Sequence, residues 1–376
     1  MNQTRFLPLA VLLSATIALA APADGAAAGG SPITTEQSKV ADAAFLQYAP
    51  APSAGAGALC LVDSGVHPNP DTTPGLIYAT SLDGATNDDV DPQGHGTIMA
   101  MTAGGAGVGL RGAWPQLKIV SVRETNVPPP SQEPSYEFDN YTQGVSLCEQ
   151  LQAKYPIKAI ELALTSTLPP SPDEIQNFAD AVSKAQSQNI AIVAAAGNTP
   201  GTVEWPGQQA GILAVGAGDP TNGICPFSAT QGVTLFGPGC NLDMADPFTD
   251  TYEPQLGGQG TSQASAFTAA VVVALMSYDP NLTASNAETL LLKTANGGFL
   301  DVAAAFNADS LGAIVNQGNA NIPPPPAATT STTSTTTSTA PAPAPKPRAL
   351  VGKPTLRSLT WRRGTLAIRL RSLPRG

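Results

Sequence analysis

Hydrophobic residues in the middle of the chain fall into short apolar runs separated by segments with helical periodicity. The clearest unit starts with residues 159–164 (AIELAL) and ends with residues 190–195 (IAIVAA). Between them, residues 171–174 (SPDE) combine an N-cap serine, a proline at the first helical position and a glutamate three residues after the cap. Apolar residues then recur at helical spacing: Ile175, Phe178, Ala179, Val182 and Ala185. This order of strand, capped helix and strand predicts a right-handed crossover between parallel strands.

The same alternation extends over a domain that we place at residues 58–310. Residues 285–288 (SNAE) read as a second capping box, which opens a helix through Lys293. Three further apolar runs are candidates for buried strands: residues 58–62, 117–122 and 212–215. Strands that are apolar on both faces are typical of parallel sheets with helices on each side. The pattern therefore predicts an α/β domain with a mainly parallel central sheet.

The first 20 residues have the features of a secretory signal peptide. A single charge, Arg5, precedes an apolar run over residues 7–20, and Ala18 and Ala20 supply the small residues that a signal peptidase needs. The alternative is a membrane anchor, but the run is short for a spanning helix. We expect cleavage after Ala20, and no later segment is long and apolar enough to cross a membrane.

The segments outside the domain differ from it in composition. Residues 21–57 form an Ala/Gly/Pro-rich N-terminal arm, and residues 311–347 form a Pro/Thr/Ser-rich linker that cannot bury enough apolar surface to fold. Residues 348–376 form a basic tail. Within it, apolar and basic residues alternate on both sides of Arg363-Gly364, which predicts a β-hairpin.

The charge of the chain is divided between the domain and the tail. Only 12% of residues are charged, about half the share of an average soluble domain, and the composition excludes collagen, coiled coils and basic nucleic-acid-binding proteins. Nine of the 18 basic residues follow residue 345, and no acidic residue does. Residues 1–345 therefore contain the other nine basic residues and all 28 acidic residues. The net charge is therefore −19 up to residue 345 and +9 after it. We expect the tail to dock on an anionic cell-envelope polymer, and we expect no nucleic-acid partner.

Export makes disulfides feasible for the four cysteines. Cys225 and Cys240 flank one compact segment and are the expected pair, with a gain of about 3 kcal/mol in the chain-entropy treatment of a loop of this length. Cys60 lies in an apolar run and Cys148 in a predicted helix, and we interpret both as buried thiols. No pair of cysteines has the spacing of a metal site.

Three residues with catalytic potential lie at the predicted edges of strands and helices. Asp63 ends the run LCLVD, His95 lies between two glycines, and Ser262 opens a long apolar helix. Taken singly, each has an ordinary explanation, namely a turn-capping aspartate, a structural histidine and an N-cap serine. Together they supply a nucleophile, its base and the carboxylate that orients the base. Asn198 follows the run AAAG and places an amide donor for an oxyanion at the same edge of the sheet.

The order Asp63 (VDSG), His95 (GHGT), Asn198 (AAAGN) and Ser262 (GTSQAS) resembles the subtilisin-like serine protease family. The resemblance spans about two-thirds of the chain and implies the three-layer fold of that family. It implies that Ser262 is the nucleophile, that His95 is general base and then general acid, and that Asp63 orients His95. The Asn198 side chain and the Ser262 backbone N–H would form the oxyanion hole.

The resemblance also implies where a substrate binds. Its backbone would pair by strand addition with Ala163, Leu164 and Thr165. The family usually has glycine where Thr165 stands and proline where Ala266 stands.

The resemblance also raises the possibility that the chain binds calcium. Many relatives bind Ca²⁺, and four aspartates precede His95 without an EF-hand spacing: Asp83, Asp88, Asp89 and Asp91. We interpret them as a solvated acidic loop. Catalysis is expected to require no metal or other cofactor, and a structural calcium ion is the alternative.

The sequence as a whole favours a secreted or cell-envelope-associated serine endopeptidase that acts on proteins or peptides through an acyl-enzyme intermediate. The alternative from another class is a catalytically weak homologue that binds peptides or a cell-surface polymer. A narrower alternative is the group of secretion-system-associated subtilases, which carry a similar Pro-rich linker but typically end in a membrane helix.

Overall fold

The computed structural model describes most of the domain and two strands of the tail. The described residues are 44, 46, 49–84, 90–124, 138–166, 168–249 and 258–315, together with the backbone of 356–362 and 365–370. The predicted signal peptide, most of the N-terminal arm, nearly all of the linker and the turn of the predicted hairpin lie outside these residues.

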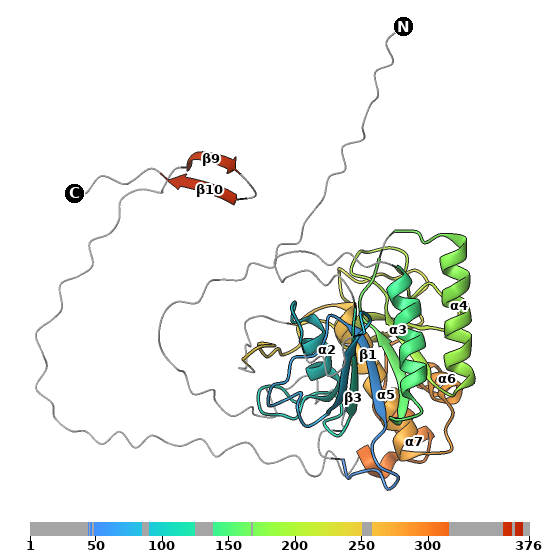
Figure 1. The fold of residues 1–376 in the computed structure, drawn as a ribbon. Helices are drawn as coiled ribbons and strands as arrows, with labels where there is room; N and C mark the ends of the chain where they lie inside the picture. The colour runs from blue at the N-terminus through green and yellow to red at the C-terminus, as the bar shows by residue number, and fades with distance from the viewer. Residues whose placement is uncertain are drawn as a thin grey trace, which may run out of the picture. The chain divides into compact units, whose positions relative to one another are not determined.

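A mainly parallel sheet runs through the domain (Figure 1). Its strand order is β2-β3-β1-β4-β5-β6-β7, with β8 also paired to β6. The β6–β7 pair is antiparallel and the other pairs are parallel. The strands are β1 (Ala58–Asp63), β2 (Leu76–Ser81), β3 (Lys118–Arg123), β4 (Ile157–Leu162), β5 (Ala191–Ala195), β6 (Leu213–Asp219), β7 (Gly223–Ile224) and β8 (Leu235–Gly237).

Alternate residues of each central strand point into two different hydrophobic cores. In β1, Leu59 and Leu61 belong to one core, whereas Cys60 and Val62 belong to the other. The first core is closed by α2 (His95–Gly104), α5 (Thr261–Tyr278), α6 (Ala284–Thr294) and α7 (Val302–Ala308). The second is closed by α3 (Phe138–Leu151) and α4 (Pro172–Ser187). The prediction of a three-layer α/β domain is therefore confirmed.

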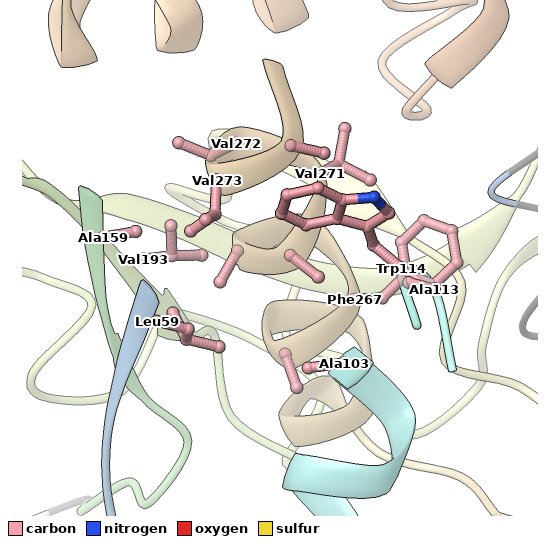
Figure 2. Close-up of a cluster of buried hydrophobic side chains, with 14 of the residues drawn as sticks. Leu59, Ala103, Ala113, Trp114, Ala159, Val193, Phe267, Val271, Val272 and Val273 are labelled. Carbon is pink, nitrogen blue, oxygen red and sulfur yellow. The ribbon is translucent and has the colours of Figure 1, made fainter. Parts of the chain in front are cut away.

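Helix α5 passes through the middle of the first core (Figure 2). Every residue from Thr261 to Ser277 is buried. In Figure 2 its Phe267 and Val271–Val273 lie among side chains of the sheet, of α2 and of the segment that carries Trp114. A helix that is apolar all round must be surrounded by protein, which explains the long apolar run after Ser262.

The first predicted capping box is correct, and the second is displaced. The Ser171 hydroxyl accepts a hydrogen bond from the Glu174 N–H, and the Glu174 carboxylate accepts one from the Ser171 N–H at 2.6 Å. The other helix, α6, is capped by Thr283 rather than Ser285. Both hydroxyls are suitable caps, but starting the helix at Ala284 places Ala284 and Ala287 in the core, so tertiary packing decides the start.

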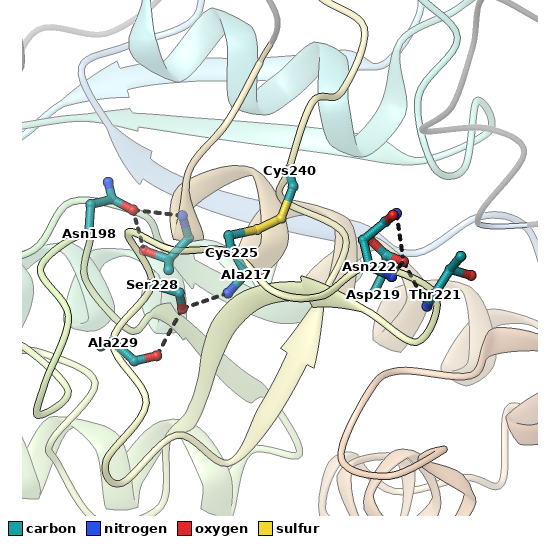
Figure 3. Close-up of a disulfide and its surroundings, with 10 residues drawn as sticks. Asn198, Ala217, Asp219, Thr221, Asn222, Cys225, Ser228, Ala229 and Cys240 are labelled. Atoms are coloured by element: carbon teal, nitrogen blue, oxygen red, sulfur yellow. Dashed lines mark hydrogen bonds between the residues drawn. A yellow bond between two sulfur atoms is a disulfide. The ribbon is translucent and has the colours of Figure 1, made fainter.

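All four cysteines form disulfides. The expected bond between Cys225 and Cys240 is confirmed (Figure 3). The interpretation of Cys60 and Cys148 as buried thiols is wrong, since they are bonded to each other across 88 residues. Cys60 points from β1 into the second core, and Cys148 lies on the buried face of α3 above it. A loop of that length gains about 4–5 kcal/mol in the chain-entropy treatment.

The tail is a separate unit, which clusters by its contacts as Ala327–Gly376. Its strands β9 (Leu356–Arg362) and β10 (Thr365–Leu370) pair in antiparallel orientation, where the alternation predicts a hairpin. Across the described residues, no helix has both the length and the apolar character that a membrane span requires.

Candidate active site

Asp63 and His95 meet at the carboxyl end of the sheet. Asp63 is the last residue of β1 and is 1% exposed, and His95 is the first residue of α2. Nδ1 of His95 lies 2.8 Å from Oδ1 and 3.0 Å from Oδ2 of Asp63. A carboxylate can only accept here, so Nδ1 carries the proton and donates it. The neutral imidazole therefore has its lone pair on Nε2, which is the tautomer that a general base needs.

Two glycines allow the strand end and the helix to approach each other. A Cβ atom on Gly96 would lie 2.1 Å from the Gly65 carbonyl oxygen and 3.0 Å from Oδ1 of Asp63. Gly65 has a φ of 112°, and a Cβ there would lie 2.1 Å from the Val90 carbonyl oxygen. Gly65 of the VDSG motif and Gly96 of the GHGT motif are thus required because a larger residue would clash with the backbone at these positions.

Asp91 anchors the segment that carries His95. It is 3% exposed, so it is not part of a solvated loop. One oxygen accepts from the Ser64 hydroxyl at 2.8 Å and from the backbone N–H groups of Gln93 and Gly94 at 3.0 and 2.7 Å. The other accepts from the Thr97 N–H at 2.9 Å and the Thr97 hydroxyl at 2.6 Å. The solvated-loop interpretation is therefore wrong for Asp91. Its carboxylate accepts hydrogen bonds from backbone N–H groups at the start of α2, which have no acceptor within the helix.

The other aspartates of that segment differ from Asp91. The Asp83 side chain is 53% exposed and lies 3.6 Å from the Arg123 guanidinium, while Asp88 and Asp89 lie outside the described residues. Among the described residues, no three His, Cys, Asp or Glu side chains form a group that could hold a metal ion.

Ser262 and Asn198 lie at the start of α5. Ser262 is 6% exposed, and its hydroxyl donates to the Ala163 carbonyl oxygen at 2.9 Å. The Asn198 amide oxygen accepts from the N–H and the hydroxyl of Thr261, at 2.9 and 3.1 Å. Because Thr261 donates both hydrogen bonds to the amide oxygen of Asn198, the NH₂ group of this amide points away from Thr261. The arrangement fixes the orientation that an oxyanion donor requires.

The three expected substrate contacts follow β4. Ala163 and Leu164 are 2% and 3% exposed, so both residues are buried. The Thr165 hydroxyl donates to Oε2 of Glu204 at 2.6 Å. The next residue, Ser166, forms an antiparallel bridge with Trp205.

Two fully buried glutamates lie behind Asp63. Glu161 is in β4 beside β1, and the Glu124 N–H donates to the Asp63 carbonyl oxygen at 2.9 Å. Burial, and then the nearby Asp63 charge, raise the pKa of each carboxyl well above its usual value. The Ser265 hydroxyl lies within hydrogen-bond distance of Oε1 of Glu161 and 2.9 Å from the Ser262 carbonyl oxygen.

Four supporting residues were missed by sequence reasoning, namely Ser64, Asp91, Thr261 and Glu204. Ser64 and Thr261 are direct neighbours of predicted site residues, so motif position could have indicated them. The contacts of Asp91 with Ser64 and of Glu204 with Thr165 span 27 and 39 residues of sequence, and no local pattern reveals them.

Comparison with known proteins gives a consistent result. The sequence model of the subtilase family matches residues 56–335. The minor extracellular protease Epr of Bacillus subtilis is 30% identical over 59% of this chain and 32% of its own length. The serine protease AprX of Bacillus subtilis is 25% identical over 62% of this chain and 60% of its own length. This chain thus spans from a third to three-fifths of these two relatives.

Solved structures show the same fold. Sphericase superimposes with a TM-score of 0.58 and 21% identity, covering 70% of this chain and 91% of that protein. The MycP3 protease from the type VII (ESX-3) secretion system superimposes with a TM-score of 0.59 and 23% identity, covering 74% of this chain and 89% of that protein.

Proposed function

We propose, from the premise that this chain belongs to the subtilase family, that it is a serine endopeptidase with Asp63, His95 and Ser262 as its triad. The observation that carries the proposal is the contact between Asp63 and Nδ1 of His95, at 2.8 Å, which leaves Nε2 as the basic atom. Protein or peptide substrates are the class that the protease relatives support.

The proposed reaction starts at the Ser262 hydroxyl. This hydroxyl exchanges its hydrogen bond with Ala163 for one with Nε2 of His95, which takes the proton as Oγ attacks the substrate carbonyl. The Asp63 carboxylate stabilises the imidazolium that forms, and the Asn198 amide and the Ser262 N–H stabilise the oxyanion. His95 then protonates the leaving amine, and water hydrolyses the acyl-enzyme by the same steps in reverse order. No cofactor takes part in these steps.

The substrate is proposed to lie along Ala163–Thr165 as an added strand. Strand addition recognises the substrate through hydrogen bonds between the two backbones. Protonation of His95 at acidic pH removes the base, so peptide hydrolysis is expected to fall as the medium becomes acidic.

One observation favours a second candidate, a catalytically weak homologue that binds peptides. The Ser262 hydroxyl donates to the Ala163 carbonyl oxygen, which competes with donation to His95. The two candidate functions are distinguished by whether the protein reacts with a fluorophosphonate and hydrolyses a protein substrate. A fluorophosphonate that labels the protein at Ser262, with hydrolysis of casein, supports the endopeptidase, whereas peptide binding without labelling supports the weak homologue.

We also propose that the chain is exported and that its basic tail holds it at the cell envelope. The apolar run of residues 7–20 and the extracellular relative support export, and the +9 charge after residue 345 supports binding to an anionic polymer. Deleting residues 346–376 should release the protein from the envelope fraction into the medium without changing its peptide hydrolysis. Unchanged retention of the shortened chain would contradict the role of the tail.

A further inference from the structure

Glu204 places a carboxylate between two segments of the candidate site. Glu204 is only 8% exposed, although it lies in the irregular segment that follows Asn198. Oε2 accepts the Thr165 hydroxyl at 2.6 Å, which ties Glu204 to the expected substrate strand. A Cβ on Gly197 would lie 2.4 Å from the Glu204 carboxyl carbon, so this carboxyl packs against the backbone next to Asn198. Glu204 therefore contacts both segments that flank a bound peptide.

The Glu204 carboxylate has little compensation within the protein. Of the ion pairs formed between described residues, none includes Glu204. A carboxylate offers about four acceptor sites, and the Thr165 hydroxyl occupies one of them. A largely buried carboxylate is costly unless a cation or several donors face it. A ligand that brings a cation to this position would therefore bind with a favourable charge pair.

A bound substrate would bring its side chain to this position. In the proposed function, the attacked carbonyl lies between Ser262 and Asn198 while the peptide backbone follows Ala163–Thr165. The residue that owns the carbonyl must then lie between the segments that Glu204 joins. A side chain that points from it into the protein meets the Glu204 carboxylate.

We propose that Glu204 is a specificity-determining residue that selects lysine or arginine as the residue whose carbonyl is attacked. This inference rests on the proposed function and names its substrate class. Thr165 has a supporting role, since its hydroxyl fixes one oxygen of the carboxylate and a glycine at this position could not. The family usually has glycine there, so the supporting hydroxyl of Thr165 is a departure from the usual pattern of the family.

The test compares lysine with norleucine, whose side chain lacks only the amino group. Fluorogenic peptides that differ in this one residue are assayed with the full chain, with Glu204→Gln and with the control Asp180→Asn, which removes an exposed carboxylate of α4. We expect the wild type to prefer lysine at least about tenfold in kcat/KM, as for a charge-assisted hydrogen bond in a partly buried site. Glu204→Gln should lower kcat/KM for lysine about 30-fold and leave norleucine within about threefold. Asp180→Asn should match the wild type.

Several results would overturn the proposal. Equal kcat/KM for lysine and norleucine in the wild type would do so, as would a lysine preference that survives in Glu204→Gln. An equal loss on both peptides in a folded Glu204→Gln would show that Glu204 only braces Thr165. If that variant does not fold, inhibition of the wild type by an argininal peptide is compared with a norleucinal peptide, and equal inhibition refutes the proposal.

The same experiment distinguishes this proposal from the proposed function. Labelling at Ser262 with hydrolysis of the norleucine peptide, but without a preference for lysine, refutes the role of Glu204 alone. A wild type that neither reacts with the fluorophosphonate nor hydrolyses any peptide refutes both.

Discussion

The substitution Asp91→Asn should destabilise the domain much more than the interpretation of Asp91 as part of a solvated acidic loop would suggest. The carboxylate accepts five hydrogen bonds from Ser64, Gln93, Gly94 and Thr97. An amide has the same shape, but its NH₂ end cannot accept. With its oxygen toward Ser64, the NH₂ end faces the Thr97 N–H, and that buried donor loses its partner. The flipped amide would leave three donors without an acceptor.

The magnitude follows from those contacts. A buried donor without a partner costs about 1–3 kcal/mol, and loss of the charge weakens the remaining hydrogen bonds. We expect Asp91→Asn to lower the free energy of unfolding by about 2–4 kcal/mol. Because the same contacts place the first turn of α2, we also expect kcat/KM to fall at least about tenfold through displacement of His95.

Urea unfolding with the disulfides intact measures the first effect, and hydrolysis of a fluorogenic peptide measures the second. The matched control is Asp83→Asn, since the Asp83 side chain is 53% exposed and its contact with Arg123 is 3.6 Å long. That control should change the free energy of unfolding by less than about 1 kcal/mol. If Asp91→Asn unfolds at the same urea concentration as Asp83→Asn, the anchoring role of Asp91 is refuted.

Two further predictions concern the oxyanion donor and a buried acid. Asn198→Ala should lower kcat about 10²–10³-fold with little change in KM, and Thr261→Val should lower kcat less, because it removes only one of the two hydrogen bonds that orient the amide. An unchanged kcat in Asn198→Ala would exclude it as an oxyanion donor. Burial raises the pKa of Glu288 to about 7, so the folded state keeps a proton that the unfolded state releases above its ordinary pKa of 4.5. Stability should therefore fall by about 3 kcal/mol as pH rises through this window, and thermal or urea unfolding of Glu288→Gln should lack that slope. Parallel pH curves for wild type and variant would contradict the assignment.

Local signals in the sequence predicted the parts of the fold that depend on neighbouring residues. The capping box of α4 needs only Ser171 and Glu174, and it is formed as expected. The apolar run after Ser262 predicts a long apolar helix, and α5 is that helix, buried on all sides. The choice between Thr283 and Ser285 as the cap of α6 depends on which alanines enter the core, and the sequence contains no record of that packing.

Contacts between distant residues account for the rest. The Cys60–Cys148 disulfide spans 88 residues and depends on β1 and α3 meeting in one core. The contact between Ser64 and Asp91 depends on two loops meeting at the carboxyl edge of the sheet. Motif order could predict Asp63, His95, Asn198 and Ser262 because the resemblance supplies the distant pairing that a single sequence lacks. No comparable motif contains Asp91 or Glu204.

Reaction with a fluorophosphonate, mapped by mass spectrometry of the digested protein, tests the central claim most directly. The account predicts one modification, at Ser262, in the folded wild type. It predicts no modification in Ser262→Ala, and slow modification in Asp63→Asn, which no longer holds His95 in the basic tautomer. Labelling of folded Ser262→Ala at the wild-type rate, or no labelling of the folded wild type, would contradict the claim that this chain is a serine protease.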